Sequence, residues 1–400
     1  MSSDNTPTVY LRKRRAQPFL NRHPWVFAGA IQRVEGDPKP GAEVILRSDD
    51  GHFIARGLFN PTSNIRVRLY SWAEDQPIDD DLLRQRIDEA VSLRRDLFAH
   101  NENSAYRLIF SEADGLSGLT VDRYDDWLLV QLTSLALAER RESLFDLLEE
   151  RCKPQGIWLR TEKGMRKLEG LEITDGLVRG EEPPRPIRIR ENGLTFLVDV
   201  AEGQKTGTFL DQRDNRRAAA SYVRGGRVLD LFCYAGGFGI TAAKLGQAES
   251  VVCVDSSEPA LAAARANAAA NEAEERIEFV RSDVFRFLET AVADGRQFDT
   301  IVLDPPKMVR RQSGVGSALK GYRSLNELAA RLVRPGGTLV TCSCSGHVSL
   351  GDFQAVLARV STTLDRRIQV LETRGHAPDH PVSPNCPENE YLKCLICRIV

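Results

Sequence analysis

The carboxyl-terminal half of the chain repeats a pattern that few folds accommodate: a short apolar run followed by a segment of helical periodicity. The apolar runs are residues 228–231, 251–254, 277–280, 300–303 and 338–341, and helices are expected at 238–245, 258–272, 284–293, 321–333 and 351–363. Runs that barely alternate between apolar and polar residues indicate strands buried on both faces, as in a parallel sheet covered by helices. The pattern therefore predicts a doubly wound, Rossmann-like α/β domain.

The first of these strands leads into a glycine-rich turn at residues 234–239, after which the chain resumes as a helix. Glycines let the backbone approach a ligand that a Cβ would push away, and the helix N-terminus offers free N–H groups. This order is typical of a nucleotide-type cofactor site, although many turns carry paired glycines for steric reasons alone.

Three acidic residues follow successive strands where a nucleoside would be held. Asp230 lies at the first strand and turn. Asp255 ends the second strand, 25 residues later, near the spacing at which a carboxylate meets a ribose hydroxyl. Asp283 follows the third strand, where a side chain or a backbone N–H can contact an adenine edge. Any one of them could cap a helix, but the three in succession indicate a nucleoside site.

Two cofactors compete for this site. A dinucleotide would require Gly-x-Gly-x-x-Gly, whereas the turn carries Gly236, Gly237 and Gly239 without that spacing and has no Lys or Arg to meet phosphates. S-adenosylmethionine has no phosphate, and its amino-acid end suits an acidic strand end such as Asp230. We therefore favour S-adenosylmethionine.

Two motifs at the carboxyl ends of the fourth and fifth strands carry candidate chemistry. Asp304 opens a rigid turn, Asp304-Pro305-Pro306-Lys307, on the rim where ligands bind in such sheets. Asp-Pro-Pro followed by an aromatic residue is typical of enzymes that methylate exocyclic amines, but the fourth residue here is Lys307. The fifth strand ends with two thiols, Cys342 and Cys344.

A thiol beside Asp304 suggests nucleophilic catalysis on a pyrimidine. Carbon 5 of a pyrimidine takes a methyl group only after a thiolate has added at carbon 6 and increased the electron density on carbon 5. Asp304 could hydrogen-bond N3 and the exocyclic amine and stabilise the charge of the adduct. The alternative, two small buried thiols, stays open at this point.

The amino-terminal half has a different composition. Strands are expected at 44–46, 53–55 and 65–70, the last with clear alternation, and Asp49-Asp50-Gly51 predicts a hairpin turn between the first two. The run Arg12–Arg15, with Arg22 nearby, makes this segment basic; it is either an RNA-binding face or a solvated surface. Farther along, helices are expected within 76–100 and at 138–151, with strands at 107–110, 119–122, 128–132 and 157–160.

Bulk properties narrow the class of protein. A length of 400 residues predicts two or three domains, and a net charge of −2 gives no whole-chain signal for nucleic acid. No apolar run reaches the roughly 18 residues of a membrane span, and the polar N-terminus lacks a signal peptide, so we expect a cytoplasmic protein.

The eight cysteines are irregularly spaced and indicate reduced thiols. Zinc ligation by Cys386, Cys394, Cys397 and His380 is a weaker alternative to a terminal strand, and no metal is expected.

Several motifs together carry a family resemblance. Residues 11–13, 22–27, 57–61 and 65–68 resemble the PUA domain, a compact RNA-binding pseudo-barrel, that opens a family of bacterial ribosomal RNA methyltransferases. Nearly the whole chain is similar to the PUA-containing 23S ribosomal RNA 5-methylcytosine methyltransferases, on motifs at 204–213, 234–238, 255, 283–285, 304–307, 321–322, 343–346, 379–381 and 391–393. The resemblance implies a class I methyltransferase domain over 183–400, preceded by a PUA-like domain over 1–75 and a small α+β domain over 76–182.

The resemblance also implies roles for particular residues. The nucleophile of that family is the cysteine of Ser-Cys-Ser-Gly, which corresponds to Cys344; the position of Cys342 is not a cysteine in the family pattern. The residues implied to bind the cofactor are Gln204, Thr206, Phe209, Asp211, Arg213, Asp230, Phe232, Tyr234, Gly236, Asp255, Asp283 and Asp304. The residues implied to bind RNA are Arg12, Lys13, Arg14, Arg22 and Lys307.

Three functions are carried forward. The first is cytosine-C5 methylation of ribosomal RNA through Cys344, with the target base extruded from its helix. The second is methylation of an exocyclic amine of guanine or adenine without covalent catalysis. The third is an inactive methyltransferase fold that serves as an RNA-binding assembly factor. The target nucleotide, the choice between naked RNA and an assembled particle, and the choice between monomer and homodimer are left open by the sequence.

Overall fold

The computed structural model describes residues 6–161, 163–200, 207–309 and 311–400. The chain forms two compact units, and each is assembled from three separate stretches. The first unit comprises 1–187, 198–208 and 378–389; the second comprises 188–197, 209–377 and 390–400. We call residues 378–389 the C-terminal segment. The domain limits at 75 and 182 remain predictions.

The first unit begins with a six-stranded sheet in the order β2-β6-β5-β4-β1-β3, in which only β1 and β4 pair in parallel. Its elements are β1 (Thr8–Leu11), α1 (Gln17–Leu20), β2 (Trp25–Phe27), η1 (Ala28–Ala30), β3 (Ile31–Glu35), β4 (Glu43–Arg47), β5 (Phe53–Phe59) and β6 (Ile65–Ser71). The β4–β5 hairpin turns at residues 48–52, so the predicted hairpin at Asp49-Asp50-Gly51 is confirmed.

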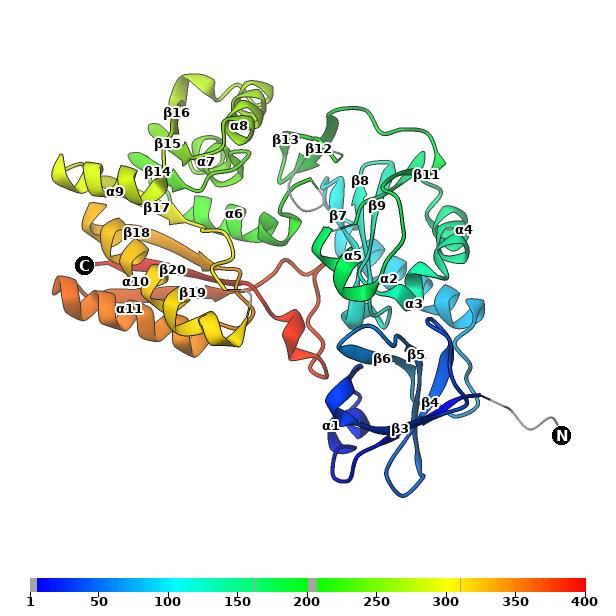
Figure 1. The fold of residues 1–400 in the computed structure, drawn as a ribbon. Coiled ribbons are helices and arrows are strands. Elements are labelled where there is room, and N and C mark those ends of the chain that lie inside the picture. Colours follow the sequence, from blue (N-terminus) through cyan, green and yellow to red (C-terminus); the bar gives the residue numbers. More distant parts are fainter. Residues whose placement is uncertain (1–5, 162, 201–206, 310) are drawn as a thin grey trace. The chain divides into compact units, whose positions relative to one another are not determined.

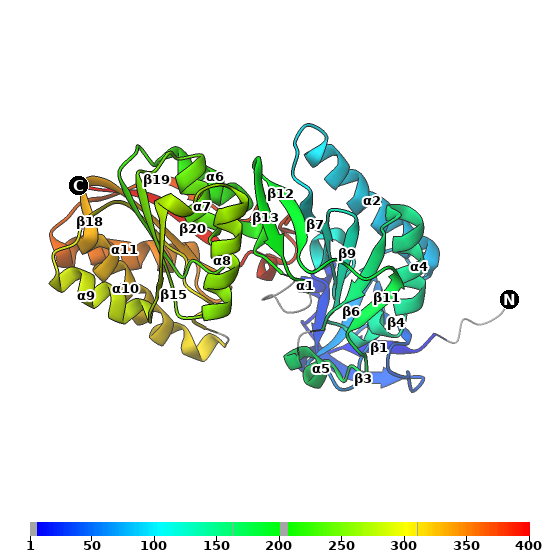
Figure 2. The ribbon, with the colours of Figure 1, turned by 90° about the horizontal axis from the view of Figure 1, so that it is seen from above.

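A second sheet in this unit has the order β11-β10-β9-β8-β7. Helices α2 and α4 pack together beside it, as Figures 1 and 2 both show. The elements are α2 (Asp80–Phe98), β7 (Ala105–Phe110), η2 (Ser111–Asp114), β8 (Leu119–Tyr124), β9 (Trp127–Leu132), α3 (Leu135–Ala138), α4 (Arg141–Cys152), β10 (Gly156–Leu159), α5 (Lys163–Glu169) and β11 (Gly176–Gly180). The C-terminal segment adds η6 (Pro387–Asn389).

The second unit contains a seven-stranded sheet in the order β16-β15-β14-β17-β18-β20-β19. The first five strands are parallel, and β20 runs antiparallel to both of its neighbours. The strands are β14 (Arg227–Leu231), β15 (Ser250–Asp255), β16 (Ile277–Arg281), β17 (Phe298–Leu303), β18 (Val333–Ser343), β19 (Ile368–Arg374) and β20 (Lys393–Ile399). The predicted doubly wound sheet is confirmed, and its terminal strand contains Cys394 and Cys397.

Helices cover both faces of this sheet, α6, α7 and α8 on one face and α9, α10 and α11 on the other (Figures 1 and 2). They are α6 (Arg213–Ser221), α7 (Gly237–Lys244), α8 (Glu258–Ala270), α9 (Val284–Ala293), α10 (Val315–Leu332) and α11 (Leu350–Leu364). The remaining elements are η3 (Leu210–Gln212), η4 (Glu274–Arg276), η5 (Gln312–Gly314) and the hairpin β12 (Ile187–Glu191) and β13 (Leu194–Val198).

Local sequence explains where these helices begin. Ser257 caps α8 by accepting a hydrogen bond from the N–H of Ala260, a contact worth about 1 kcal/mol, and Pro259 suits the first turn. Helix α10 begins at Val315, earlier than the predicted 321, because Ala318 and Leu319 extend the apolar face that packs on the sheet. Among the described residues, no helix combines the length and apolar character needed to cross a membrane.

Candidate active site

The predicted site residues converge where the strand order of the large sheet reverses. Strand β14 is first in the chain but lies between β15 and β17, so the carboxyl ends of β14 and β17 flank the crevice in which doubly wound sheets bind ligands. Asp230, Asp255 and Asp304 lie at or just beyond the carboxyl ends of β14, β15 and β17. The loop that contains Cys344 follows β18, the strand beside β17, and therefore lies on the same edge.

The turn after β14 has a strained backbone. Phe232 and Tyr234 have φ values of +61° and +48°, in the left-handed region that costs a non-glycine residue on the order of 1–3 kcal/mol, and Gly236 follows at +80°. The turn is held against β15 by hydrogen bonds from the N–H of Cys233 to the Val254 carbonyl (3.1 Å) and from the N–H of Tyr234 to Asp255 (3.0 Å). Strain maintained in this way is typical of ligand-binding turns.

Asp230 is buried beneath this turn, with 1% of its surface exposed. One carboxylate oxygen accepts the N–H of Gly239 at 2.8 Å, and no cationic side chain of the described residues lies within ion-pair distance. Burial raises the pKa of Asp230 to about 8; the charges of Asp304 and Asp255 act in the same direction, and the Gly239 hydrogen bond opposes them. A buried carboxyl group in this state favours a cationic ligand.

The other two predicted carboxylates have backbone partners. Asp255 accepts the N–H groups of Tyr234 and Ser257, at 3.0 and 2.9 Å, so it shapes the turn and the start of α8. Asp283 is exposed and caps α9 by accepting the N–H of Arg286 at 3.0 Å. Their contacts with a ribose and an adenine remain predictions.

The glycines of the turn are sterically required. A Cβ on Gly239 would lie 2.4 Å from the sulfur of Cys253, and one on Gly237 would lie 2.9 Å from Cδ of Arg216. Together with the buried Asp230, this backbone fits the amino-acid end of S-adenosylmethionine, which presents an ammonium group and no phosphate. Asp230 and the 232–237 turn would hold that end of the cofactor.

Residues 209–216 include side chains that lie beside the glycine-rich turn. The ring of Phe209 meets that of Tyr234 edge-on, with centroids 5.4 Å apart, and Asp211 accepts the hydroxyl of Tyr391 at 2.5 Å. Arg213 is buried and pairs with Asp214 at 3.0 Å. Gln204 and Thr206 lie outside the described residues.

Arg216, which sequence reasoning missed, is fixed beside the glycine turn. Its guanidinium forms a bidentate pair with Glu191 of β12, at 2.7 and 2.8 Å, and donates to the Phe209 carbonyl at 3.0 Å. The role of Arg216 could not be predicted from the neighbouring sequence, because its partner Glu191 lies in a hairpin that contains none of the recognised motifs.

Asp304 is half-buried, and a network on one side holds its carboxylate. Gln212 donates to one carboxylate oxygen at 3.1 Å and accepts from Asn215 at 2.7 Å. Arg374 of β19 in turn donates to Asn215 at 3.0 Å. Gln212 lay within a motif of the family resemblance but had no predicted role; the structure makes it the residue that orients Asp304.

The thiol of Cys342, within β18, and that of Cys344, just after it, differ in environment. Cys342 is completely buried opposite Cys394 of β20, and that contact together with burial raises its pKa well above the ordinary value for a thiol. Cys344 lies one residue beyond the strand, is partly exposed, and has its sulfur 3.8 Å from the Pro305 carbonyl oxygen. Since the thiolate is the nucleophile, Cys344 is the better placed of the two.

The backbone on both sides of Cys344 is fixed by buried hydroxyls. The Tyr322 hydroxyl lies 3.0 Å from the hydroxyls of both Ser343 and Ser345. The Ser345 hydroxyl also accepts the N–H of Met308, at 3.3 Å, which ties this loop to the one that contains Asp304. Tyr322 is fully buried, so the thiol projects from a rigid loop.

A buried lysine completes this loop. Lys393 has 5% of its surface exposed, and its ammonium donates to the carbonyls of Ser345 (2.7 Å) and Tyr391 (2.9 Å). Burial lowers the pKa of Lys393 to about 8, and Cys344 opposes this shift. The positive charge of this ammonium and the negative charge of a Cys344 thiolate therefore stabilise each other.

The residues predicted to bind RNA occupy exposed positions in both units. Arg12, Lys13 and Arg14 form a turn after β1, with Arg14 in the left-handed region, and Arg22 lies in the turn after α1. In the second unit, Lys307 is exposed in the loop that begins at Asp304. Their contacts with RNA remain predictions.

Cys386, from the weaker zinc alternative, lies near His23 and Glu388 in the first unit, with all three potential ligand atoms within 4.8 Å of one another. Nδ1 of His23 accepts the N–H of Trp25 at 3.2 Å, so a neutral ring carries its proton on Nε2, the atom that faces Glu388. That proton occupies the lone pair a metal would need.

Comparisons with known proteins show which families and relatives this chain matches. Residues 9–72 match the PUA-like domain family, and residues 117–387 match the S-adenosylmethionine-dependent methyltransferase family. Proteins of Erwinia tasmaniensis and Photobacterium profundum, both named ribosomal RNA large subunit methyltransferase I, are 41% and 42% identical to this chain. The alignments cover 99% and 98% of this chain and 100% of each relative.

Two solved structures share the fold over 98% of this chain and 99% of their own. A methyltransferase crystallised with SAH superimposes with a TM-score of 0.85, and a SAM-dependent methyltransferase from Streptococcus mutans with 0.84, each at 20% identity. The fold, the glycine turn over Asp230 and these matches agree. The chain belongs to the S-adenosylmethionine-dependent methyltransferases and, within them, to the family of ribosomal RNA large subunit methyltransferase I.

Proposed function

We propose that this protein methylates carbon 5 of a cytosine in large-subunit ribosomal RNA through a covalent bond between Cys344 and carbon 6 of the base. The main support is the position of Cys344. Its sulfur lies 3.8 Å from the Pro305 carbonyl oxygen, and Lys393 donates a hydrogen bond to the carbonyl of the next residue, Ser345. A partly exposed thiol and a half-buried carboxylate share one edge of the cofactor-binding sheet.

The chemistry requires a nucleophile because carbon 5 of cytosine is a weak one. The Cys344 sulfur, as a thiolate, forms a bond to carbon 6, and the electron pair of the C5–C6 double bond then becomes available at carbon 5. S-adenosylmethionine would supply an electrophilic methyl group to carbon 5, and its sulfur would keep the electron pair of the broken C–S bond. The proton on carbon 5 then leaves to water, the C5–C6 double bond re-forms, and the bond to Cys344 breaks, which restores the thiolate.

Asp304 stabilises the charge that develops during this reaction. Its carboxylate can accept hydrogen bonds from the exocyclic amine and from a protonated N3, and Gln212 fixes its orientation before the base arrives. Removal of a preorganised group of this kind typically lowers the rate by about 10²–10³-fold.

The RNA substrate is supported by the relatives and by the PUA-like domain. The full-length relatives are named as methyltransferases of large-subunit ribosomal RNA. Carbon 6 is inaccessible within a stacked helix, so the target base must leave its stack to reach Cys344.

The test compares two cysteine variants on the same RNA. We expect Cys344→Ala to abolish methyl transfer, with at least about a 10³-fold loss, while Cys342→Ala retains most of the activity. The measurement is transfer of labelled methyl from S-adenosylmethionine to ribosomal RNA from a strain that lacks the protein, followed by mass spectrometry of the nucleosides.

Each other outcome selects an alternative. Full activity of Cys344→Ala would exclude the covalent route, and a methyl group on an exocyclic nitrogen would identify an amine methyltransferase. Failure of the wild-type protein to bind S-adenosylmethionine in calorimetry would indicate an inactive assembly factor.

A further inference from the structure

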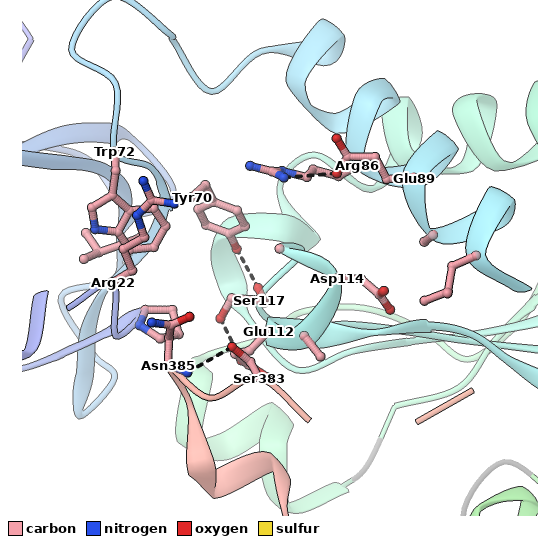
Figure 3. Close-up of a pocket in the computed structure, with 16 residues that line it drawn as sticks. Arg22, Tyr70, Trp72, Arg86, Glu89, Glu112, Asp114, Ser117, Ser383 and Asn385 are labelled. Atoms are coloured by element: carbon pink, nitrogen blue, oxygen red, sulfur yellow. Dashed lines mark hydrogen bonds and ion pairs between the residues drawn. The ribbon is translucent and has the colours of Figure 1, made fainter. Parts of the chain in front are cut away.

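A cavity of about 350 Å³ lies within the first unit, and none of the residues that line it belongs to the catalytic edge. Its wall combines β6 and the turn after α1, helix α2, the loop from η2 to β8, and the C-terminal segment. In Figure 3, Arg22 and Arg86 approach the ring of Tyr70 from different sides of the cavity, and Ser383 and Asn385 come from the C-terminal segment.

The acidic groups of the wall are already matched. Asp114 forms a bidentate pair with Arg94, at 2.7 and 2.8 Å. Glu112 accepts from Trp25 at 2.9 Å and pairs with Arg68 at 3.3 Å. These two carboxylates therefore contribute little net negative charge to the cavity.

Of the two arginines in the wall, Arg22 leaves a positive charge unmatched, and Arg86, whose charge is matched by Glu89 of the same wall, leaves a donor unmatched. Arg22 has no ion pair within the part of the chain that the structure describes, and its φ of +61° lies in the left-handed region. Arg86 pairs with Glu89 at 3.1 Å, but its Nε–H is buried without an acceptor among the described residues. A buried donor and an unpaired guanidinium in the wall of one cavity favour an anion and disfavour a metal cation.

The aromatic part of the wall is held in place. Trp72 is partly exposed, and its Nε1 donates to the Phe19 carbonyl at 2.9 Å. The buried Tyr70 donates its hydroxyl to the Ser117 carbonyl at 2.5 Å. Rings fixed in this way offer a stacking surface at little entropic cost, and each base stacked on such a ring gains about 1–3 kcal/mol.

The volume and the polar groups fit more than a bare anion. A cavity of about 350 Å³ is at the lower end of small-ligand sites, which is enough for one nucleotide. Ser383 and Asn385 add groups that can both donate and accept hydrogen bonds, as base edges require.

We propose that this cavity binds one unstacked nucleotide, with its phosphate at Arg22 and Arg86 and its base against Trp72. The nucleotide belongs to the RNA substrate and is not the one that is methylated, so the inference rests on the proposed action on RNA. The cavity is then a second recognition point that fixes the position of the RNA on the first unit.

The test measures binding of protein-free large-subunit ribosomal RNA across a salt series. The proteins are the wild type, Arg22→Gln, Arg86→Gln and, as a matched control, Arg95→Gln, an exposed arginine of α2 whose side chain is 74% exposed. We expect each cavity variant to weaken binding about tenfold and to lower the salt slope by about one, because each loses a phosphate contact, while the control is unchanged. The second readout is quenching of tryptophan fluorescence by free nucleoside monophosphates, with Trp72→Phe to identify the responding ring.

The outcomes separate the possibilities. If both cavity variants match Arg95→Gln in affinity and salt slope while the wild type binds RNA, the cavity proposal is wrong and the proposed function stands. If the wild type and the control also fail to bind ribosomal RNA, the proposed function itself is in error. Quenching by free nucleotides that depends on Arg22 and Arg86, with RNA affinity unchanged, would identify a free nucleotide as the ligand and overturn the assignment to RNA.

Discussion

The buried charges of the two units are arranged differently. In the first unit they are paired: Arg94 forms two bonds to Asp114, and Arg107 pairs with Asp122. The catalytic edge of the second unit has one such buried pair, Arg216 with Glu191, but among the described residues Asp230 accepts only the Gly239 N–H and Lys393 donates only to carbonyls.

The paired and the unpaired buried charges have different roles, one in stabilising the fold and the other in ligand binding and catalysis. A buried charge with a full set of partners resists titration and holds elements together, whereas a buried charge without an opposite charge lowers stability until a ligand or a reaction step supplies one. The pKa values follow this division, because burial moves those of Asp230 and Lys393 to about 8 from opposite directions.

The largest effect is expected from breaking a pair in the first unit. Arg94→Met leaves Asp114 buried without a cation and removes a donor to the Asp379 carbonyl, so we expect a loss of about 3–5 kcal/mol in the free energy of unfolding. Denaturant titration measures it, with Arg95→Met of the same helix as a control expected within about 0.5 kcal/mol of wild type. A loss as small as that of the control would mean that the pair is not structural.

Asp230→Asn should affect ligand binding instead. The amide keeps the acceptor for the Gly239 N–H but loses the charge, so we expect S-adenosylmethionine to bind about 10- to 100-fold more weakly. Calorimetric titration gives the dissociation constant. Asp299→Asn, at the opposite end of the strands, is the control. An equal loss of S-adenosylmethionine affinity in that variant would show that the effect is not specific to Asp230.

Lys393→Met should lower catalysis without affecting cofactor affinity. The variant loses the donors that hold the Ser345 carbonyl and the charge beside Cys344, so we expect kcat to fall about tenfold. The wild-type rate should also lose this support above about pH 8, where Lys393 releases its proton, and the variant should show no such step. Lys320→Met, an exposed lysine of α10, should match the wild type. A raised KM for S-adenosylmethionine with unchanged kcat would contradict this role.

The last prediction concerns the pH dependence of stability, an effect that accumulates over several pH units. The pKa of Asp230 is higher in the folded protein than in the unfolded chain, so the folded state binds more protons between about pH 4 and pH 8. The contribution of Asp230 to stability is therefore lost as the pH rises through this range, by at most about 1.4 kcal/mol per pH unit. Unfolding of cofactor-free wild type and Asp230→Asn from pH 5 to pH 8 measures the difference; equal slopes would show that Asp230 does not titrate there.

The parallel strands of the large sheet were predictable because each of them has a local signal, whereas the edge strand β19 was not predicted. Apolar runs and helical periodicity gave the β14–β18 elements in order, and Ser257 marked one helix start correctly. The grouping of Asp230, Asp255 and Asp304 at one edge followed from their places after strands, since parallel strands bring their carboxyl ends to one edge.

The supporting residues could not be predicted in this way. Gln212 orients Asp304, Glu191 fixes Arg216 and Lys393 holds the Cys344 loop, and each acts on a residue far away in sequence. Periodicity describes neighbours along one element and carries no signal for such contacts. The same reason hid Asp379, a residue of a resemblance motif, whose carboxylate accepts the N–H of Arg107 in the first unit.

The C-terminal segment has a consequence for the order in which the chain matures during synthesis. The first unit includes residues 1–187 but is completed only by residues 378–389. At about 5–20 residues per second, the roughly 190 residues between them take about 10–40 s to translate. During that interval the N–H of Arg107 and one donor of Arg94 lack their native acceptors on Asp379. The nascent first unit is therefore open to chaperones and proteases until residues 378–389 have been synthesised.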